Sequence, residues 1–233
     1  IAYDGRNGTK LWDYQGISET ASILGGASPA VDQGIVVAAF SSGDVVALRV
    51  ENGNQLWTDS LTGSRRTDAI SQLTAIRGRP IIDRGRVFAI SNSGSFVSID
   101  LKTGRRIWSK DLSSQETPWI AGDYLFIVTP DAEVVCVNRN NGLIHWVTAL
   151  PRWEDPEDRR GVITWSTPIL VSDRLIVAGS NEEAYSVSLI QVKSWDVLRC
   201  LIALLYRHWQ RVKTCCSSRT VQIWWLTAKR KKR

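Results

Sequence analysis

The feature that most constrains this chain is an interval of 28 residues between a proline and a tryptophan, which occurs three times. The intervals run from Pro29 to Trp57, from Pro80 to Trp108 and from Pro118 to Trp146. Each tryptophan closes a Gly-x-x-x-Trp unit, and a fourth such unit ends at Trp12. A fixed internal period indicates a fold built from repeated supersecondary units, with the variable lengths confined to the connections between them.

Short apolar runs predict the strands of each unit. The predicted strands are 30–31, 35–39 and 45–50 in the first unit, 81–82, 87–90 and 96–99 in the second, and 119–120, 124–128 and 134–137 in the third. Asn52-Gly53, Thr103-Gly104 and Asn141-Gly142 follow, and Asn-Gly predicts a tight hairpin with the primed turns that strands prefer. A fourth strand carries the tryptophan. Four short antiparallel strands per repeat are typical of an all-β fold, the β-propeller.

The recurring tryptophans are interpreted as wedges between neighbouring blades. A blade cannot bury both of its faces alone, and a tryptophan buries on the order of 200 Å². A glycine beside it lets the ring approach without meeting a Cβ. A ligand-binding platform is the alternative interpretation. The predicted blade-docking residues are Trp12, Trp57, Trp108, Trp146, Gly53, Gly104 and Gly142.

The repeat pattern divides the chain into residues 1–188 and 189–233. A further copy begins at Pro168, but Val192 and Asp196 stand where its glycine and tryptophan are expected. Residues 189–233 contain 11 Lys and Arg against one acid, whereas residues 1–188 contain 18 against 22. We interpret 189–233 as an aberrant basic tail, the product of an out-of-frame reading, which the nucleotide sequence would test. A membrane-surface helix or a nucleic-acid patch are the alternatives, and we expect no nucleic-acid partner.

No constellation of catalytic or metal-binding residues is evident before residue 189. Cys136 is the one cysteine there, so no disulfide framework is predicted. His145 is the one histidine and is expected on the surface of a strand. Neither Cys-x-x-Cys nor His-Glu-x-x-His spacing occurs. We expect no metal, no cofactor and no enzymatic activity.

Residues 98–108 read Ser-Ile-Asp-Leu-Lys-Thr-Gly-Arg-Arg-Ile-Trp. This run resembles the propeller repeat named for pyrroloquinoline quinone (PQQ). Two groups share the repeat, the quinoprotein dehydrogenases and the BamB-type lipoproteins of the outer-membrane β-barrel assembly (BAM) machine. The insertion between Trp57 and Pro80, with Thr62-Gly63-Ser64 near its start, resembles a BamB loop and favours the second group. A fragment of a PQQ-dependent dehydrogenase with Ca²⁺ is the alternative.

The resemblance implies a ring of eight blades, of which this chain holds about four. It also implies a non-enzymatic scaffold at the periplasmic face of the Gram-negative outer membrane, with an N-terminal lipid anchor outside this sequence. The implied partners are the periplasmic domains of BamA and unfolded outer membrane proteins.

Two family loops bind BamA, and both differ in this chain. The first, Leu-x-Leu-Arg-Gly, matches 21–25, where Leu24 replaces the arginine. The second carries two acids, where Ala75 and Arg77 stand here. The expected partner-binding residues are Ile23, Leu24, Gly25, Ala75 and Arg77.

Overall fold

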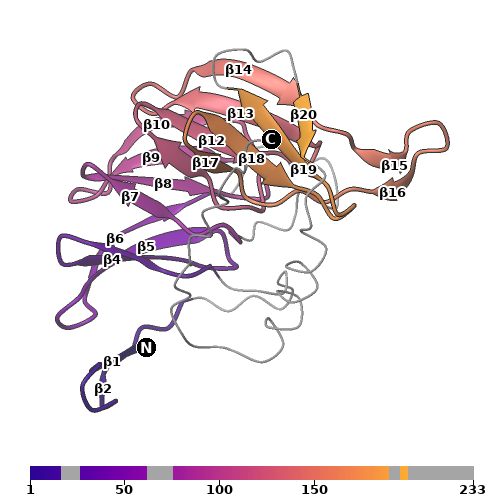
Figure 1. Cartoon of the computed structure of the whole chain (residues 1–233). Helices are drawn as coiled ribbons and strands as arrows, with labels where there is room; N and C mark the ends of the chain where they lie inside the picture. The colour runs from indigo at the N-terminus through magenta and orange to yellow at the C-terminus, as the bar shows by residue number, and fades with distance from the viewer. Residues whose placement is uncertain (17–26, 62–75, 189–194, 199–233) are drawn as a thin grey trace, which may run out of the picture.

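The structure is a computed structural model that describes residues 1–16, 27–61, 76–188 and 195–198. These residues form twenty β-strands, and within them no helix occurs. Figure 1 shows the sheets arranged in chain order like the blades of a fan. The prediction of an all-β propeller with four-stranded antiparallel blades is confirmed.

Four blades are built from consecutive antiparallel strands. The first blade contains β3 (Ala30–Asp32), β4 (Ile35–Ala39), β5 (Asp44–Arg49) and β6 (Gln55–Ser60). The second contains β7 (Ile81–Asp83), β8 (Arg86–Ile90), β9 (Phe96–Asp100) and β10 (Arg106–Lys110). The third contains β11 (Trp119–Ala121), β12 (Tyr124–Val128), β13 (Glu133–Asn138) and β14 (Ile144–Ala149). The fourth contains β17 (Ile169–Val171), β18 (Arg174–Ala178), β19 (Ala184–Ser188) and β20 (Trp195–Leu198).

Two further strand pairs lie outside the four blades. A two-stranded sheet of β1 (Ala2–Tyr3) and β2 (Lys10–Trp12) precedes the first blade. Between the third and fourth blades, β15 (Trp153–Asp155) and β16 (Arg160–Val162) form a hairpin that projects away from the blades in Figure 1. Its two strands pair across a turn at 156–159, with Trp153 facing Val162 and Asp155 facing Arg160.

The hairpins before each tryptophan correct one expectation. Gly53 is the last of four loop residues, and its N–H donates to the Arg49 carbonyl at 2.9 Å. Only the glycine has a positive φ, 71°, so this is not a two-residue primed turn. The Asn52 side chain instead accepts the N–H of Asn54 at 3.0 Å. In the second blade the hydroxyl oxygen of Thr103 accepts the equivalent hydrogen bond, from the N–H of Arg105. The position before the glycine therefore requires only a side-chain oxygen, which either asparagine or threonine provides.

The primed turns lie at another connection of the same end of the blade, between its first two strands. Gln33 and Gly34 have φ of 47° and 75°, and Arg84 and Gly85 have φ of 48° and 73°. Each pair forms a two-residue loop, because the residues on either side of it face each other in the sheet. Positive φ at both positions is the requirement of that turn type.

The core consists of three apolar joints between successive blades. In the first joint, Val37 and Val45 belong to the same buried cluster as Val87 and Val97. The second joint is formed by β8 and β9 against β12 and β13. The third is formed by β12 and β13 against β18 and β19. The middle strands of the second and third blades are buried on both faces, which is why their sequences are largely apolar without alternation.

The predicted division at residue 188 stays a prediction, because 189–194 and 199–233 lie outside the described residues. The four described residues beyond it form β20, which pairs with β19 and completes the fourth sheet. Asp196 faces Ser186 across this pair. In the third blade the equivalent pair is Cys136 with Trp146. The backbone register therefore places Asp196 at the tryptophan position of the repeat.

Candidate functional site

The chain path gives the propeller two different faces. The turns between the second and third strands of each blade lie on one face, together with the connections from each blade to the next. Main-chain hydrogen bonds join the two sets, from Leu61 N to Gly43 O at 2.8 Å and from Leu150 N to Ala132 O at 2.7 Å. We call this the loop face. The opposite face carries the primed turns and the glycine hairpins.

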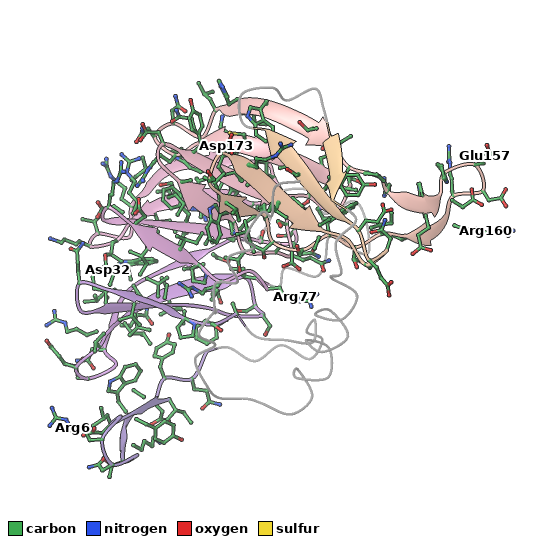
Figure 2. All side chains as sticks on the ribbon, in the orientation of Figure 1. Arg6, Asp32, Arg77, Glu157, Arg160 and Asp173 are labelled. Atoms are coloured by element: carbon green, nitrogen blue, oxygen red, sulfur yellow. The ribbon has the colours of Figure 1, made fainter. Side chains whose placement is uncertain are left out.

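The predicted partner-binding residues come from two segments of the sequence, 23–25 and 75–77. Ile23, Leu24, Gly25 and Ala75 lie outside the described residues. Arg77 is described, and it is exposed at the position labelled in Figure 2. Its guanidinium Nη1 donates to Gln115 Oε1 at 3.3 Å. Arg77 is therefore held against the next connection.

The connection at 76–80 is packed along the connection that follows the second blade. The main-chain N–H of Arg79 donates to Thr117 Oγ1 at 2.9 Å. Gly78 lies so close that a Cβ there would be 2.7 Å from the Glu116 carbonyl oxygen. The amide of Gln115 continues the chain of contacts by donating to Asn92 Oδ1 at 3.1 Å. Two connections from different blades thus form one continuous surface.

Buried serines beneath this surface form hydrogen bonds to main-chain carbonyls of the neighbouring blades. The hydroxyls of Ser91 and Ser93 each lie 3.1 Å from the Leu61 carbonyl oxygen, which belongs to the preceding blade. The Ser114 hydroxyl donates to the Val128 carbonyl of the following blade at 2.6 Å. The repeat pattern in the sequence did not indicate these residues. The signal was the alternation of serine at 91, 93 and 95, where the first blade has Phe40, Ser42 and Asp44.

The tryptophans form contacts of one type at successive blades. The indole Nε1 of Trp57 donates to the Leu101 carbonyl at 2.8 Å, and that of Trp108 donates to the Arg139 carbonyl at 2.9 Å. Each acceptor stands three residues before the glycine of the next repeat. A Cβ on Gly104 would lie 2.5 Å from Trp57 Cγ. The ring thus covers a glycine that has no room for a side chain.

The same contact joins the first strand pair to the first blade. Trp12 Nε1 donates to the Val50 carbonyl at 2.7 Å. A Cβ on Gly53 would lie 2.6 Å from Trp12 Cε3, and one on Gly142 would lie 2.8 Å from Trp108 Cδ2. The predicted docking residues from Trp12 to Gly142 are therefore brought together in pairs, each tryptophan with the glycine one repeat later.

The third joint is arranged differently. Trp146 is half-buried, and its expected partner position, 192, lies outside the described residues. The aromatic anchor of this joint is Trp165, which is buried and meets the Tyr185 ring edge-to-face at 5.1 Å. Trp165 Nε1 donates to the Pro151 carbonyl at 3.0 Å, which ties down the base of the β15–β16 hairpin. The repeat pattern did not reveal Trp165, because it lies in a connection.

Polar contacts between outer strands follow a second rule. Two residues after Trp57, Asp59 accepts two hydrogen bonds from the Arg106 guanidinium at 2.6 and 2.8 Å. Arg106 stands two residues before the next tryptophan. One repeat earlier, the Tyr14 hydroxyl donates to Gln55 Oε1 at 2.7 Å from the same two positions. The first strand pair, the first blade and the second blade are therefore linked along the rim as well as in the core.

Arg139 is the buried charge of the second joint. Its side chain is 3 % exposed and forms an ion pair with Asp83 of the preceding blade. It also donates to the main-chain oxygens of Asp83 and Gly122, each at 3.3 Å, and lies over the Phe88 ring at 5.7 Å. A buried guanidinium needs such a set of acceptors to offset its desolvation.

The described residues contain no group of three or more His, Cys, Asp and Glu side chains that could hold a metal ion. His145 is exposed, and its ring lies 5.2 Å from that of Tyr124. Burial raises the pKa of the Cys136 thiol to about 12. The described residues form no helix that is long and apolar enough to span a bilayer.

Comparison with known proteins gives one family match. The family described as outer membrane protein assembly factor BamB matches residues 1–148. The BamB of Shewanella oneidensis is 29 % identical over 145 residues, which are 62 % of this chain and 37 % of that protein. The BamB of Escherichia coli is 24 % identical over 125 residues, or 54 % of this chain and 32 % of that protein. The chain thus spans about a third of the length of these curated relatives.

Solved structures show the same fold. BamB from Moraxella catarrhalis has a TM-score of 0.69 at 23 % identity and covers 82 % of this chain and 56 % of its own. Quinohemoprotein alcohol dehydrogenase from Comamonas testosteroni has a TM-score of 0.59 at 14 % identity, over 76 % of this chain and 35 % of its own. At these identities the likeness concerns the fold alone.

Proposed function

The chain belongs to the family of the outer membrane protein assembly factor BamB, and from this premise we propose that it is a non-enzymatic scaffold subunit of the β-barrel assembly complex. The observation that carries the proposal is the family match over residues 1–148. That span includes the three tryptophan-closed blades and both connections in which partner-binding residues were expected. A shared propeller fold does not by itself transfer an activity.

The proposed partner is the periplasmic part of BamA, the barrel-inserting subunit, at the periplasmic face of the outer membrane. The proposed contact residues are Ile23, Leu24, Gly25, Ala75 and Arg77. Support comes from the loop face around Arg77, where hydrogen bonds between 76–80 and 114–117 hold two connections together. A fixed surface loses little conformational entropy when a partner binds.

Unfolded outer membrane proteins are the second proposed partner class. The family is named for the assembly of such proteins. Their transmembrane strands have apolar and polar side chains in alternation, and they remain extended until the barrel closes. A propeller offers the edges of its outer strands to partners of this kind.

The test is a binding titration of the full chain with purified BamA periplasmic domains. We expect saturable binding, and we expect Ile23→Asp to weaken it at least fivefold without lowering the unfolding temperature. Arg84→Asp is the control, because Arg84 lies in a primed turn on the opposite face and its side chain is 66 % exposed. No binding by the wild-type chain, or equal weakening by the control, would contradict the proposal. Alcohol oxidation after addition of PQQ and Ca²⁺ would replace it with an enzyme.

A further inference from the structure

The outer strand of the third blade differs from its counterparts in the first two blades. Strands β6, β10 and β14 each end a four-stranded sheet, so within the described residues no strand pairs with their outer edges. An unpaired edge presents a row of free N–H and C=O groups to any extended chain. Proteins protect such edges with charged side chains, lysine above all. The three strands can therefore be compared position by position, with the tryptophan as the common reference.

Two residues before the tryptophan stand Gln55, Arg106 and Ile144, in the order of the blades. Immediately after it stand Thr58, Ser109 and Val147. Two residues after it stand Asp59, Lys110 and Thr148. The tryptophan strand before the first blade, β2, also has charges, since Lys10 forms an ion pair with Asp13 at 2.8 Å. Among these four strands, β14 alone has no Asp, Glu, Lys or Arg.

Two apolar residues of β14 are exposed to solvent. Ile144 is 50 % exposed and Val147 is 46 % exposed. The register of β14 against β13 shifts between Cys136 and Val137, so that Ile144 faces Val137 and Val147 faces Val135. Both partners point into the second joint. The shift therefore places Ile144 and Val147 on the same face of the sheet, as an apolar stripe beside an edge with which no described strand pairs.

The rim contacts described above are also missing here. Asp59 and Arg106 bridge the first two blades across their outer strands. At the equivalent positions of the next pair, Lys110 stands opposite Ile144, which offers no acceptor. Strand β14 thus lacks the charged residue that β10 has at the equivalent position, Arg106. It also lacks the ion pair that Arg106 forms with Asp59 of the preceding blade.

We propose that the outer edge of β14 is a strand-addition site for an extended polypeptide segment with apolar side chains at alternate positions. The main-chain groups of the edge need main-chain partners one strand spacing away, about 4.8 Å, which only an extended chain supplies. Side chains of the added strand that lie beside Ile144 and Val147 are apolar, and those between them face water. This is the pattern of a transmembrane β-barrel strand, so the choice of occupant rests on the proposed function.

The experiment measures binding of a fluorescent ten-residue peptide with alternating apolar and polar residues to the full chain, by anisotropy. Val147→Lys places a charge on the edge and is expected to weaken binding at least tenfold. Ile107→Lys is the matched control, because Ile107 is an apolar outer-strand residue of β10 with 37 % exposure. It is expected to change binding less than twofold. Thermal unfolding of both variants verifies that each blade remains folded.

A second peptide separates strand addition from general apolar adhesion. It has the same side chains but N-methyl groups on alternate amides, which remove the donors on one edge, and we expect it not to bind. Equal binding of the two peptides, or equal weakening by Ile107→Lys, would overturn the proposal. A wild-type dimer that Val147→Lys dissolves would assign the edge to a second copy of the chain instead, which also overturns it.

Binding of the BamA domains to Val147→Lys is expected to equal that of the wild-type chain. Failure of the peptide experiment is therefore distinguishable from failure of the proposed function, because each has a separate partner and a separate variant.

Discussion

The first two blade joints and the third solve the same packing problem in different ways. In the first two, an indole covers a glycine of the next repeat and donates to a carbonyl three residues before it. Trp57 and Trp108 are 8 % and 9 % exposed as a result. In the third, Trp146 is half-buried, and Trp165 of the preceding connection fills the joint from the loop face.

The first two joints depend on residues of the repeat, whereas the third depends on a residue of the connection between blades. The tryptophan–glycine pair works only when both members occur, since the ring needs a partner without a Cβ. In the fourth blade Val192 stands at the position where the sequence pattern expects the glycine that would pair with Trp146. There the stability of the joint depends on a residue outside the repeat, and that residue also anchors the projecting hairpin. Each joint can thus be weakened by its own substitution.

The largest effect is expected for Trp108→Ala, which should lower the free energy of unfolding by about 3–5 kcal/mol. The substitution opens a cavity in the second joint and removes the hydrogen bond to the Arg139 carbonyl. Trp146→Ala is the comparison and should cost less, because that ring is only half-buried. Urea unfolding measures both. Equal losses would show that the two joints do not differ in this way.

Gly104→Ala should cost about 2–4 kcal/mol, the sum of a left-handed φ in a residue with a Cβ and of overpacking against the Trp57 ring. The φ of Gly104 is 72°, and the added Cβ would lie 2.5 Å from the ring. Gly85→Ala is a matched control, since its φ is 73° and nothing lies within 4 Å of the Cβ position. It should cost only about 1–2 kcal/mol. If the two variants have the same unfolding temperature, close contact with the indole is not the reason why position 104 needs a glycine.

Ser98→Ala should stabilise the protein by about 1 kcal/mol. A buried hydroxyl without a hydrogen bond loses its hydrogen bonds to water on folding and gains no protein hydrogen bond in return. Ser98 faces Trp108 across the β9–β10 pair, and its Oγ has no partner within the described residues. In the first blade the same position holds Ala47 opposite Trp57. A higher unfolding temperature is the expected readout. A lower one would reveal a hydrogen bond that the hydroxyl makes.

The smallest effect concerns Cys136, which lies in the third joint and reports its opening. With a pKa of about 12 instead of 9.0, the thiol is almost wholly neutral at pH 8 and should resist alkylation. In a Cys200, Cys215 and Cys216 to serine background, Trp165→Ala should accelerate alkylation about tenfold, whereas Trp57→Ala should not. Equal acceleration by both would mean that the joints open together.

The raised pKa also predicts a pH dependence. The unfolded thiol ionises near pH 9, whereas the folded one stays neutral until about pH 12. The stability that the neutral thiol contributes is therefore complete below pH 9 and is lost as the pH rises toward 12. Cys136→Ala should remove this part of the alkaline destabilisation when unfolding is followed between pH 8 and pH 10.

Strand positions were the most predictable part of this molecule. Strands β4 and β12 begin and end at the expected residues, and the other predicted strands differ from the observed ones by at most one residue at each end. The family resemblance drawn from residues 98–108 is confirmed by the match over 1–148. Both succeeded because the repeat supplies several independent copies of each local signal. The predicted partner-binding residues stay predictions, since only Arg77 is described.

The sequence by itself determined the blade: its four strands, the position of the glycine before the last strand, and the indole that packs between blades. These depend on local turn geometry and on a fixed period, which can be read along the chain. The tertiary structure decided that the indole covers the glycine one repeat later. Only the tertiary structure decided which residues meet across joints without a repeating position, such as Ser91 with Leu61, Arg139 with Asp83 and Trp165 with Tyr185. Packing in three dimensions selects such pairs, and no spacing along the chain encodes them.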